Sequence, residues 1–73
     1  MRYEVIREIF NSCSGNQMRD VFVTVQDVDN PEAYVKDMLK GNIDLFEIDR
    51  SKGCTIIDVV VDGLRQRFSF SED

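Results

Sequence analysis

The chain has 73 residues, of which 42% are hydrophobic and 32% charged, and its formal net charge is −5. This length and composition exclude a second domain and intrinsic disorder, so we expect one folded α+β domain over residues 1–73. The negative charge argues against binding to nucleic acid or to anionic lipid, and the apolar runs are far too short to cross a bilayer.

Residues 3–13 place their apolar side chains within an arc of about 160° on a helical wheel. A half-buried strand would instead put the neighbours Val5 and Ile6 on opposite faces, which argues against a strand. We therefore expect an amphipathic helix here. It should end near Gly15 or Asn16, where a residue in the left-handed conformation can close the helix.

Residues 19–28 have the sequence RDVFVTVQDV, which alternates valines with other side chains and predicts a strand. The next four residues, Asp29-Asn30-Pro31-Glu32, supply a helix cap, a proline suited to the first turn and an acid near the positive end of the dipole. A second helix should begin there and end at Gly41-Asn42. Its apolar stripe consists of Tyr34, Val35, Met38 and Leu39.

Three more strands are predicted after this helix. In residues 43–50 the apolar phase slips between Leu45 and Phe46, so either both faces of that strand are partly covered or a bulge interrupts it. Residues 54–61 alternate as a strand, and the last strand should run from residue 64 to about residue 71. Asp62-Gly63 between them is the pair most favoured in a two-residue hairpin turn, because both positions of a type I′ turn need positive φ.

The predicted element order is αβαβββ, which fits an α+β fold with two layers. We expect a four-stranded, mostly antiparallel sheet with both helices packed on one face. The strand at residues 19–28 could lie at either edge of the three-stranded meander, so the sequence leaves the strand order open.

The hairpin turn also fixes which residues of the last two strands face each other. It pairs Ile57 with Phe68 on an almost wholly apolar face, which should be the core. On the opposite face it pairs Val60 with Arg65 and Asp58 with Arg67. The Asp58 pair should contribute about 0.2–1 kcal/mol.

The opposite face provides the candidate partner-binding residues. Arg65 has no carboxylate directly across the ladder, although Asp58 and Asp62 are within reach as neighbours. Alternation with polar residues outside is the ordinary state of a solvated sheet face. With apolar neighbours exposed beside the arginines, however, the strip would suit a protein partner or self-association. The candidate residues are Arg65, Arg67, Val60 and Ile56.

Signatures of catalysis and of metal binding are missing from the sequence. There is no histidine, and the two cysteines, Cys13 and Cys54, are far apart and outside any CxxC motif, so we expect both to be reduced structural residues. The four glycines belong to no phosphate-binding loop, and the run DVDNPE is better explained as a helix cap than as a calcium loop. We expect no enzyme, no catalytic residue, no cofactor and no metal.

The run NQMRDVFVTVQDVDNPEAYV and the terminal GLRQRFSF resemble small uncharacterised accessory proteins of conjugative transposons and related integrative elements of Gram-positive gut bacteria. The resemblance would cover nearly the whole chain. It implies a bacterial, cytoplasmic accessory protein and brings no activity that could be assigned to residues. No secretory signal precedes the first predicted element, which also favours the cytoplasm.

The leading hypothesis is a non-enzymatic protein-binding or accessory module with an unknown protein partner, or a homodimer formed through an edge strand or the exposed sheet face. Three alternatives remain open. The chain could be an acidic mimic of nucleic acid that inhibits a basic partner, or an enzyme that uses carboxylates alone. It could also be a small DNA-binding accessory protein, if five arginines converge on one face: Arg2, Arg7, Arg19, Arg65 and Arg67.

Overall fold

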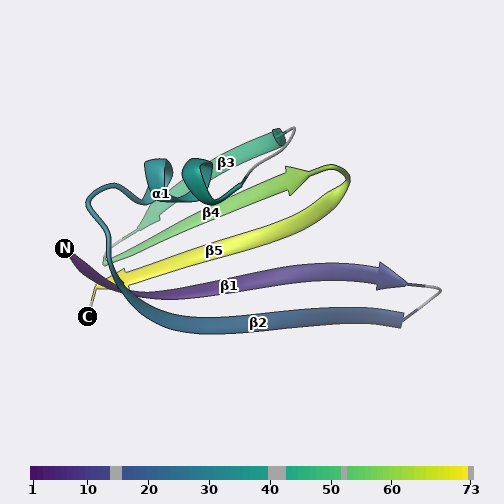
Figure 1. The fold of residues 1–73 in the computed structure, drawn as a ribbon, viewed down its shortest axis with the longest axis horizontal. Coiled ribbons are helices and arrows are strands. Elements are labelled where there is room, and N and C mark those ends of the chain that lie inside the picture. Colours follow the sequence, from purple (N-terminus) through teal and green to yellow (C-terminus); the bar gives the residue numbers. More distant parts are fainter. Residues whose placement is uncertain (14–15, 40–42, 52, 73) are drawn as a thin grey trace.

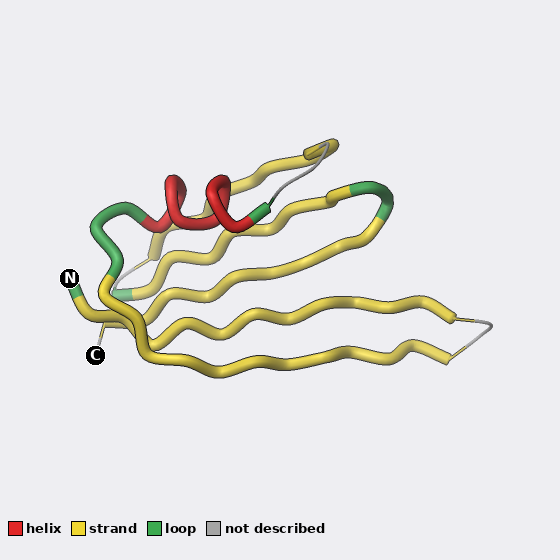
Figure 2. Tube along the Cα trace, in the orientation of Figure 1, coloured by secondary structure: helices red, strands yellow, loops and turns green. Residues whose placement is uncertain are grey.

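The computed structural model of the protein describes residues 1–13, 16–39, 43–51 and 53–72. These residues form one five-stranded antiparallel sheet with the strand order β2-β1-β5-β4-β3, and one helix lies on a single face of it (Figures 1 and 2). In chain order the elements are β1 (Arg2–Cys13), β2 (Asn16–Asp27), α1 (Pro31–Met38), β3 (Ile43–Ser51), β4 (Cys54–Val61) and β5 (Leu64–Glu72).

The predicted α+β class with two helices on a four-stranded sheet is wrong, because the first predicted helix is the strand β1. The fold is mostly β. Sequence reasoning rejected a strand on the premise that only one face would be apolar. β1 lies inside the sheet between β2 and β5, and it carries apolar residues on both faces, so neighbours such as Val5 and Ile6 can both be accommodated.

The strand order also differs from both predicted alternatives. The strand predicted at residues 19–28 corresponds to the later part of β2, which ends at Asp27, and β2 is not paired with the β3-β4-β5 meander. β1 takes the place beside β5 and forms a hairpin with β2, in which Cys13 faces Asn16. β2 is therefore one outer edge of the sheet, and β3 is the other.

The second predicted helix is present as α1, but it ends at Met38, with Leu39 extended, and not at the predicted Gly41-Asn42. Asn30 caps it, because its side-chain oxygen accepts hydrogen bonds from the main-chain N–H groups of Glu32 and Ala33 at 3.0 and 3.3 Å. Lys36 and Glu32, one turn apart, form an ion pair of 3.1 Å on the exposed side. The predicted stops at Gly15 and at Gly41-Asn42 lie outside the described residues, although Asn16 begins β2.

The core lies between α1 and the sheet. Val35 is fully buried in the helix, and it faces a set of fully buried side chains from β4 and β5: Ile57, Val59, Phe68 and Phe70. Tyr3 and Tyr34 both meet the Phe70 ring edge to face, with centroids 6.0 and 5.7 Å apart. Burial of these large side chains is the main source of stability in so small a domain.

The hairpin of β4 and β5 has the predicted register. Ile57 faces Phe68 and Asp58 faces Arg67. The turn residues Asp62 and Gly63 both have positive φ, at 51° and 79°, as a type I′ turn requires. β3 also has a register shift, between Ile43 and Leu45, just before the phase slip that the sequence predicts at Leu45 and Phe46.

Candidate protein-binding surface

The side of the sheet opposite α1 is here called the outer face. Because side chains alternate along each strand, the residues next to the buried core positions point to this face. The pairing lines them up in rows across the strands, one of which is Val23, Ile6, Ser69, Ile56 and Asp49, and another Arg19, Phe10, Arg65, Val60 and Leu45. The outer face thus carries apolar side chains from β2 to β3, and no described residue forms a layer over it.

All four residues predicted to bind a partner lie on the outer face. Ile56 and Val60 project from β4, and Arg65 and Arg67 from the neighbouring β5. Between the two apolar positions is Asp58, whose Oδ1 accepts a hydrogen bond of 2.8 Å from Nε of Arg67. This hydrogen bond, with the attraction of the same carboxylate, raises the pKa of Arg67 above its ordinary value.

Arg65 has a different environment from Arg67. Its guanidinium lies 5.2 Å from the centroid of the Phe10 ring on β1, in a cation–π arrangement. The neighbouring carboxylates Asp58 and Asp62, which the sequence suggested as possible partners, form no ion pair with Arg65 among the described side chains. Arg65 is exposed and keeps a charge that a carboxylate from another molecule could reach.

Sequence reasoning missed the part of this face on β2. Val21, Val23 and Val25 all point to the outer face and are exposed, Val23 by 59%. The signal was present in the alternation of residues 19–28, which was used to predict a strand but not an exposed apolar row. Ile6 of β1, which was expected in a helix, lies beside Val23 in the same sheet row.

Four of the five arginines proposed as a DNA-binding set lie at outer-face positions, and the fifth does not: Arg2, Arg19, Arg65 and Arg67 share that face. Arg7 lies on the α1 side, where its guanidinium donates hydrogen bonds of 2.8 and 3.1 Å to Oε1 of the buried Gln66 and stacks over Phe68 at 5.3 Å. Arg19, on the outer face, is engaged by Glu8 at 3.2 Å. On the outer face, Arg19 and Arg67 are each paired with a carboxylate of the same chain, Glu8 and Asp58.

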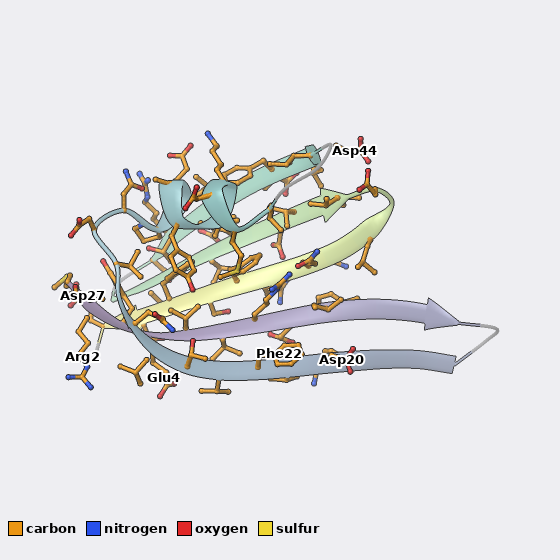
Figure 3. The ribbon with its side chains drawn as sticks, viewed as in Figure 1. Arg2, Glu4, Asp20, Phe22, Asp27 and Asp44 are labelled. Carbon is orange, nitrogen blue, oxygen red and sulfur yellow. The ribbon has the colours of Figure 1, made fainter. Side chains whose placement is uncertain are left out.

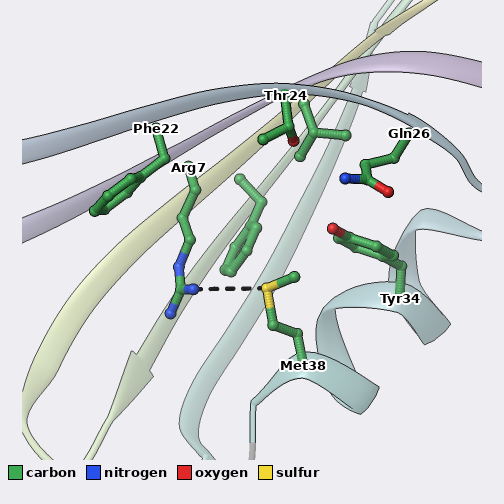
Figure 4. A pocket seen from close by; sticks show the side chains of 8 residues that line it. Arg7, Phe22, Thr24, Gln26, Tyr34 and Met38 are labelled. Carbon is green, nitrogen blue, oxygen red and sulfur yellow. Dashed lines mark hydrogen bonds between the residues drawn. The ribbon is translucent and has the colours of Figure 1, made fainter.

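Arg7 also lines a pocket between α1 and the β1-β2 hairpin (Figure 4). Its guanidinium donates to Sδ of Met38 at 3.6 Å, and Phe22, Thr24 and Tyr34 complete much of the wall. The volume of about 230 Å³ is below the roughly 300–1,000 Å³ of pockets that enclose small molecules. A more open hollow at the start of α1 has three aspartates in its lining, Asp27, Asp29 and Asp37.

The two cysteines lie at different ends of the sheet. Cys54 is a free thiol at the start of β4. It shares a sheet row with Glu4 of β1, and Cys13 lies nine residues further along that strand, about 30 Å away. Among the described residues, no group of three or more cysteine, aspartate or glutamate side chains is placed to hold a metal ion.

Fold and surface together define a small antiparallel β-sheet protein with one face covered by a helix and the other open. Comparison with protein families, with curated proteins and with solved structures found no significant match. The helix α1, with eight residues, is the longest in the described part of the chain and is too short to span a bilayer.

Proposed function

We propose that the protein is a non-enzymatic protein-binding module and that its contact surface is the outer face around Ile56, Val60, Arg65 and Arg67. The observation that carries this proposal is the row of apolar side chains across an uncovered sheet face. The resemblance to accessory proteins of bacterial mobile elements suggests a cytoplasmic setting for this role.

The charges of the outer face suit a protein interface. Arg67 and Asp58 already neutralise each other at 2.8 Å, so a partner can cover them without leaving either charge unpaired. Apolar side chains depleted of unpaired charge are typical of the centre of an interface. Ile56 and Val60, on either side of Asp58 in β4, would form that centre.

Arg65 defines the chemistry expected of the partner. It is exposed, it rests on the Phe10 ring, and arginine is one of the residues that contribute most at interfaces. We therefore expect a partner with an apolar patch for Val60 and Ile56 and a carboxylate placed opposite Arg65. A single carboxylate of the partner is enough to pair with Arg65, so the partner does not need a phosphate group.

The experiment is affinity capture from a bacterial lysate, followed by measurement of the dissociation constant with the purified partner. Val60→Lys places a charge in the apolar row, and Arg65→Ala removes the free cation. Each change should weaken binding by about tenfold or more, because each acts at the centre of the contact. Circular dichroism should show that both variants keep the fold.

Ala33→Lys is the matched control, because it adds the same charge at an exposed position of α1, on the other side of the molecule. It should leave the dissociation constant unchanged. A partner that binds both outer-face variants as tightly as the native chain, or a failure of the native chain to retain any protein, would rule out this function.

A further inference from the structure

The middle of the outer edge of β2, residues 21–26, has none of the devices that usually protect an edge strand. Residues 21–26, VFVTVQ, contain no charge, no proline and no glycine, and the pairing of β2 with β1 shows no bulge. Four of these six side chains are large apolar groups that are about half exposed: Val21, Phe22, Val23 and Val25. An edge of this kind is a template for another strand, and Figure 1 shows nothing beside it.

One hydrogen bond shows which main-chain groups of β2 face this edge. The N–H of Val28 donates to the carbonyl of Met1 at 2.8 Å, so position 28 bonds toward β1. Bonding direction alternates along an antiparallel strand, and the even-numbered positions of β2 therefore bond toward β1. The odd-numbered positions present their N–H and C=O groups to the open edge: Arg19, Val21, Val23, Val25 and Asp27.

We propose that β2 pairs antiparallel with β2 of a second copy of this chain, about a two-fold axis at Val23, to form a continuous ten-stranded sheet. In this register Val23 faces Val23 of the other copy, Val21 faces Val25, and Arg19 faces Asp27. Each of the five outward positions then forms a hydrogen-bonded pair, and each pair exchanges two bonds. Such a contact is isologous and closes after two subunits.

Charge complementarity is the reason for choosing a second copy as the occupant. In the register centred on Val23, the three central pairs join valine to valine. The two outermost pairs join Arg19 of one copy to Asp27 of the other, so opposite charges meet at both ends. Arg19 and Asp27 are 59% and 84% exposed in their side chains, so both remain within reach of another molecule. Within the chain, Arg19 forms an ion pair with Glu8 at 3.2 Å, and Asp27 forms one with the N-terminal amine at 3.1 Å.

Side chains on the α1 side of β2 support the same register. Phe22 would face Thr24 of the other copy and would lie diagonal to the second Phe22, a separation that aromatic rings bridge. Phe22 is 53% exposed in the single chain, and Figure 3 shows it on the strand at the outer edge of the sheet. Pairing would bury the large aromatic side chain that α1 leaves open to solvent.

The first test uses charge reversal and sedimentation velocity. The native chain should form dimers, whereas Arg19→Asp and Asp27→Arg should each weaken dimerisation by at least about tenfold, because each puts like charges together at both ends of the contact. An equimolar mixture of the two variants should restore dimers, because both end pairs are then complementary. The double variant R19D/D27R should also dimerise. Glu8→Gln removes the contact of Arg19 within the chain without changing a residue of β2, and it should leave dimerisation unchanged.

The second test determines the register by disulfide formation in a chain that carries C13S and C54S. Val23→Cys should crosslink two copies, because the two Cα atoms on the axis would be about 5.5 Å apart. Val25→Cys is the control, since in this register it faces position 21 and should not crosslink with itself. A native chain that stays monomeric, or a Val25→Cys crosslink in place of the Val23→Cys one, overturns the proposal.

This dimer does not depend on the proposed function, and the two are tested by different residues. Val60→Lys lies on β4 and should leave the β2 dimer intact. A dimer that is insensitive to charge reversal at Arg19 and Asp27 but is lost in Val60→Lys would mean that copies associate through their outer faces, and the edge pairing would be wrong.

Discussion

Two phenylalanines on one row of the sheet show how unevenly the molecule is covered. Phe22 on β2 and Phe68 on β5 project from the same face, and both lie beside Arg7 of the intervening β1. Phe68 is completely buried against α1, whereas Phe22 is 53% exposed. The helix covers the β3-β4-β5 side of the sheet and leaves the β2 side open (Figure 2).

The comparison separates the part of the chain that holds the fold from the part that is free to bind. Stability comes mainly from buried apolar area, and the fully buried side chains come from α1, β4 and β5. β2 adds main-chain pairing to β1 but keeps its valines and its phenylalanine exposed. Exposed apolar side chains on an unprotected edge strand promote aggregation, and a partner strand that pairs with the edge would remove this risk.

The largest expected effect tests this division directly. Phe68→Ala should destabilise the protein by about 3–5 kcal/mol, close to the whole stability of a domain of this size, because it leaves a cavity under α1. Phe22→Ala is the matched change on the exposed side and should cost less than about 1 kcal/mol. Urea denaturation of both in the Arg19→Asp chain, which we expect to be monomeric, measures the difference. Equal losses would show that the two ends of the sheet share one core.

The same division explains which elements the sequence predicted. The β4-β5 hairpin was predicted with its register, because Asp62-Gly63 determines the turn and one face is almost wholly apolar. β1 was assigned as a helix, because apolar residues on both faces of a strand imitate a wide helical stripe. Its β-branched and aromatic content, and the Ser14-Gly15 pair before β2, were the signals that favoured a hairpin.

The candidate surface was predicted in part for the same reason. Ile56, Val60, Arg65 and Arg67 belong to the well-determined hairpin, so their common face followed from its register. Their neighbour Phe10 could not be placed, because it belongs to β1. The exposed β2 row was missed because strand order depends on contacts distant in sequence, and neither periodicity nor turn residues report those contacts.

A smaller effect is expected at the start of α1, which covers the buried side of the sheet. Asn30→Ala removes the side-chain oxygen that caps the helix and should lower the free energy of unfolding by about 1 kcal/mol. Asn30→Asp keeps an acceptor at the same position and should have little effect. Thermal denaturation compares the two variants. A similar loss of stability in both would mean that Asn30 does not stabilise the protein by capping α1.

The smallest effect is expected for the ion pair on the outer face. Arg67→Ala should cost only about 0.2–1 kcal/mol, because the pair with Asp58 is partly exposed to water. The raised pKa of Arg67 means that its contribution is complete below the ordinary arginine value and is lost only above it, so Arg67 itself adds no pH dependence near neutrality. A double-mutant cycle with Asp58→Ala measures the coupling between the two side chains. A coupling above about 2 kcal/mol would show that the outer face holds the fold together, and the contrast between a stabilising covered side and a binding open side would then fail.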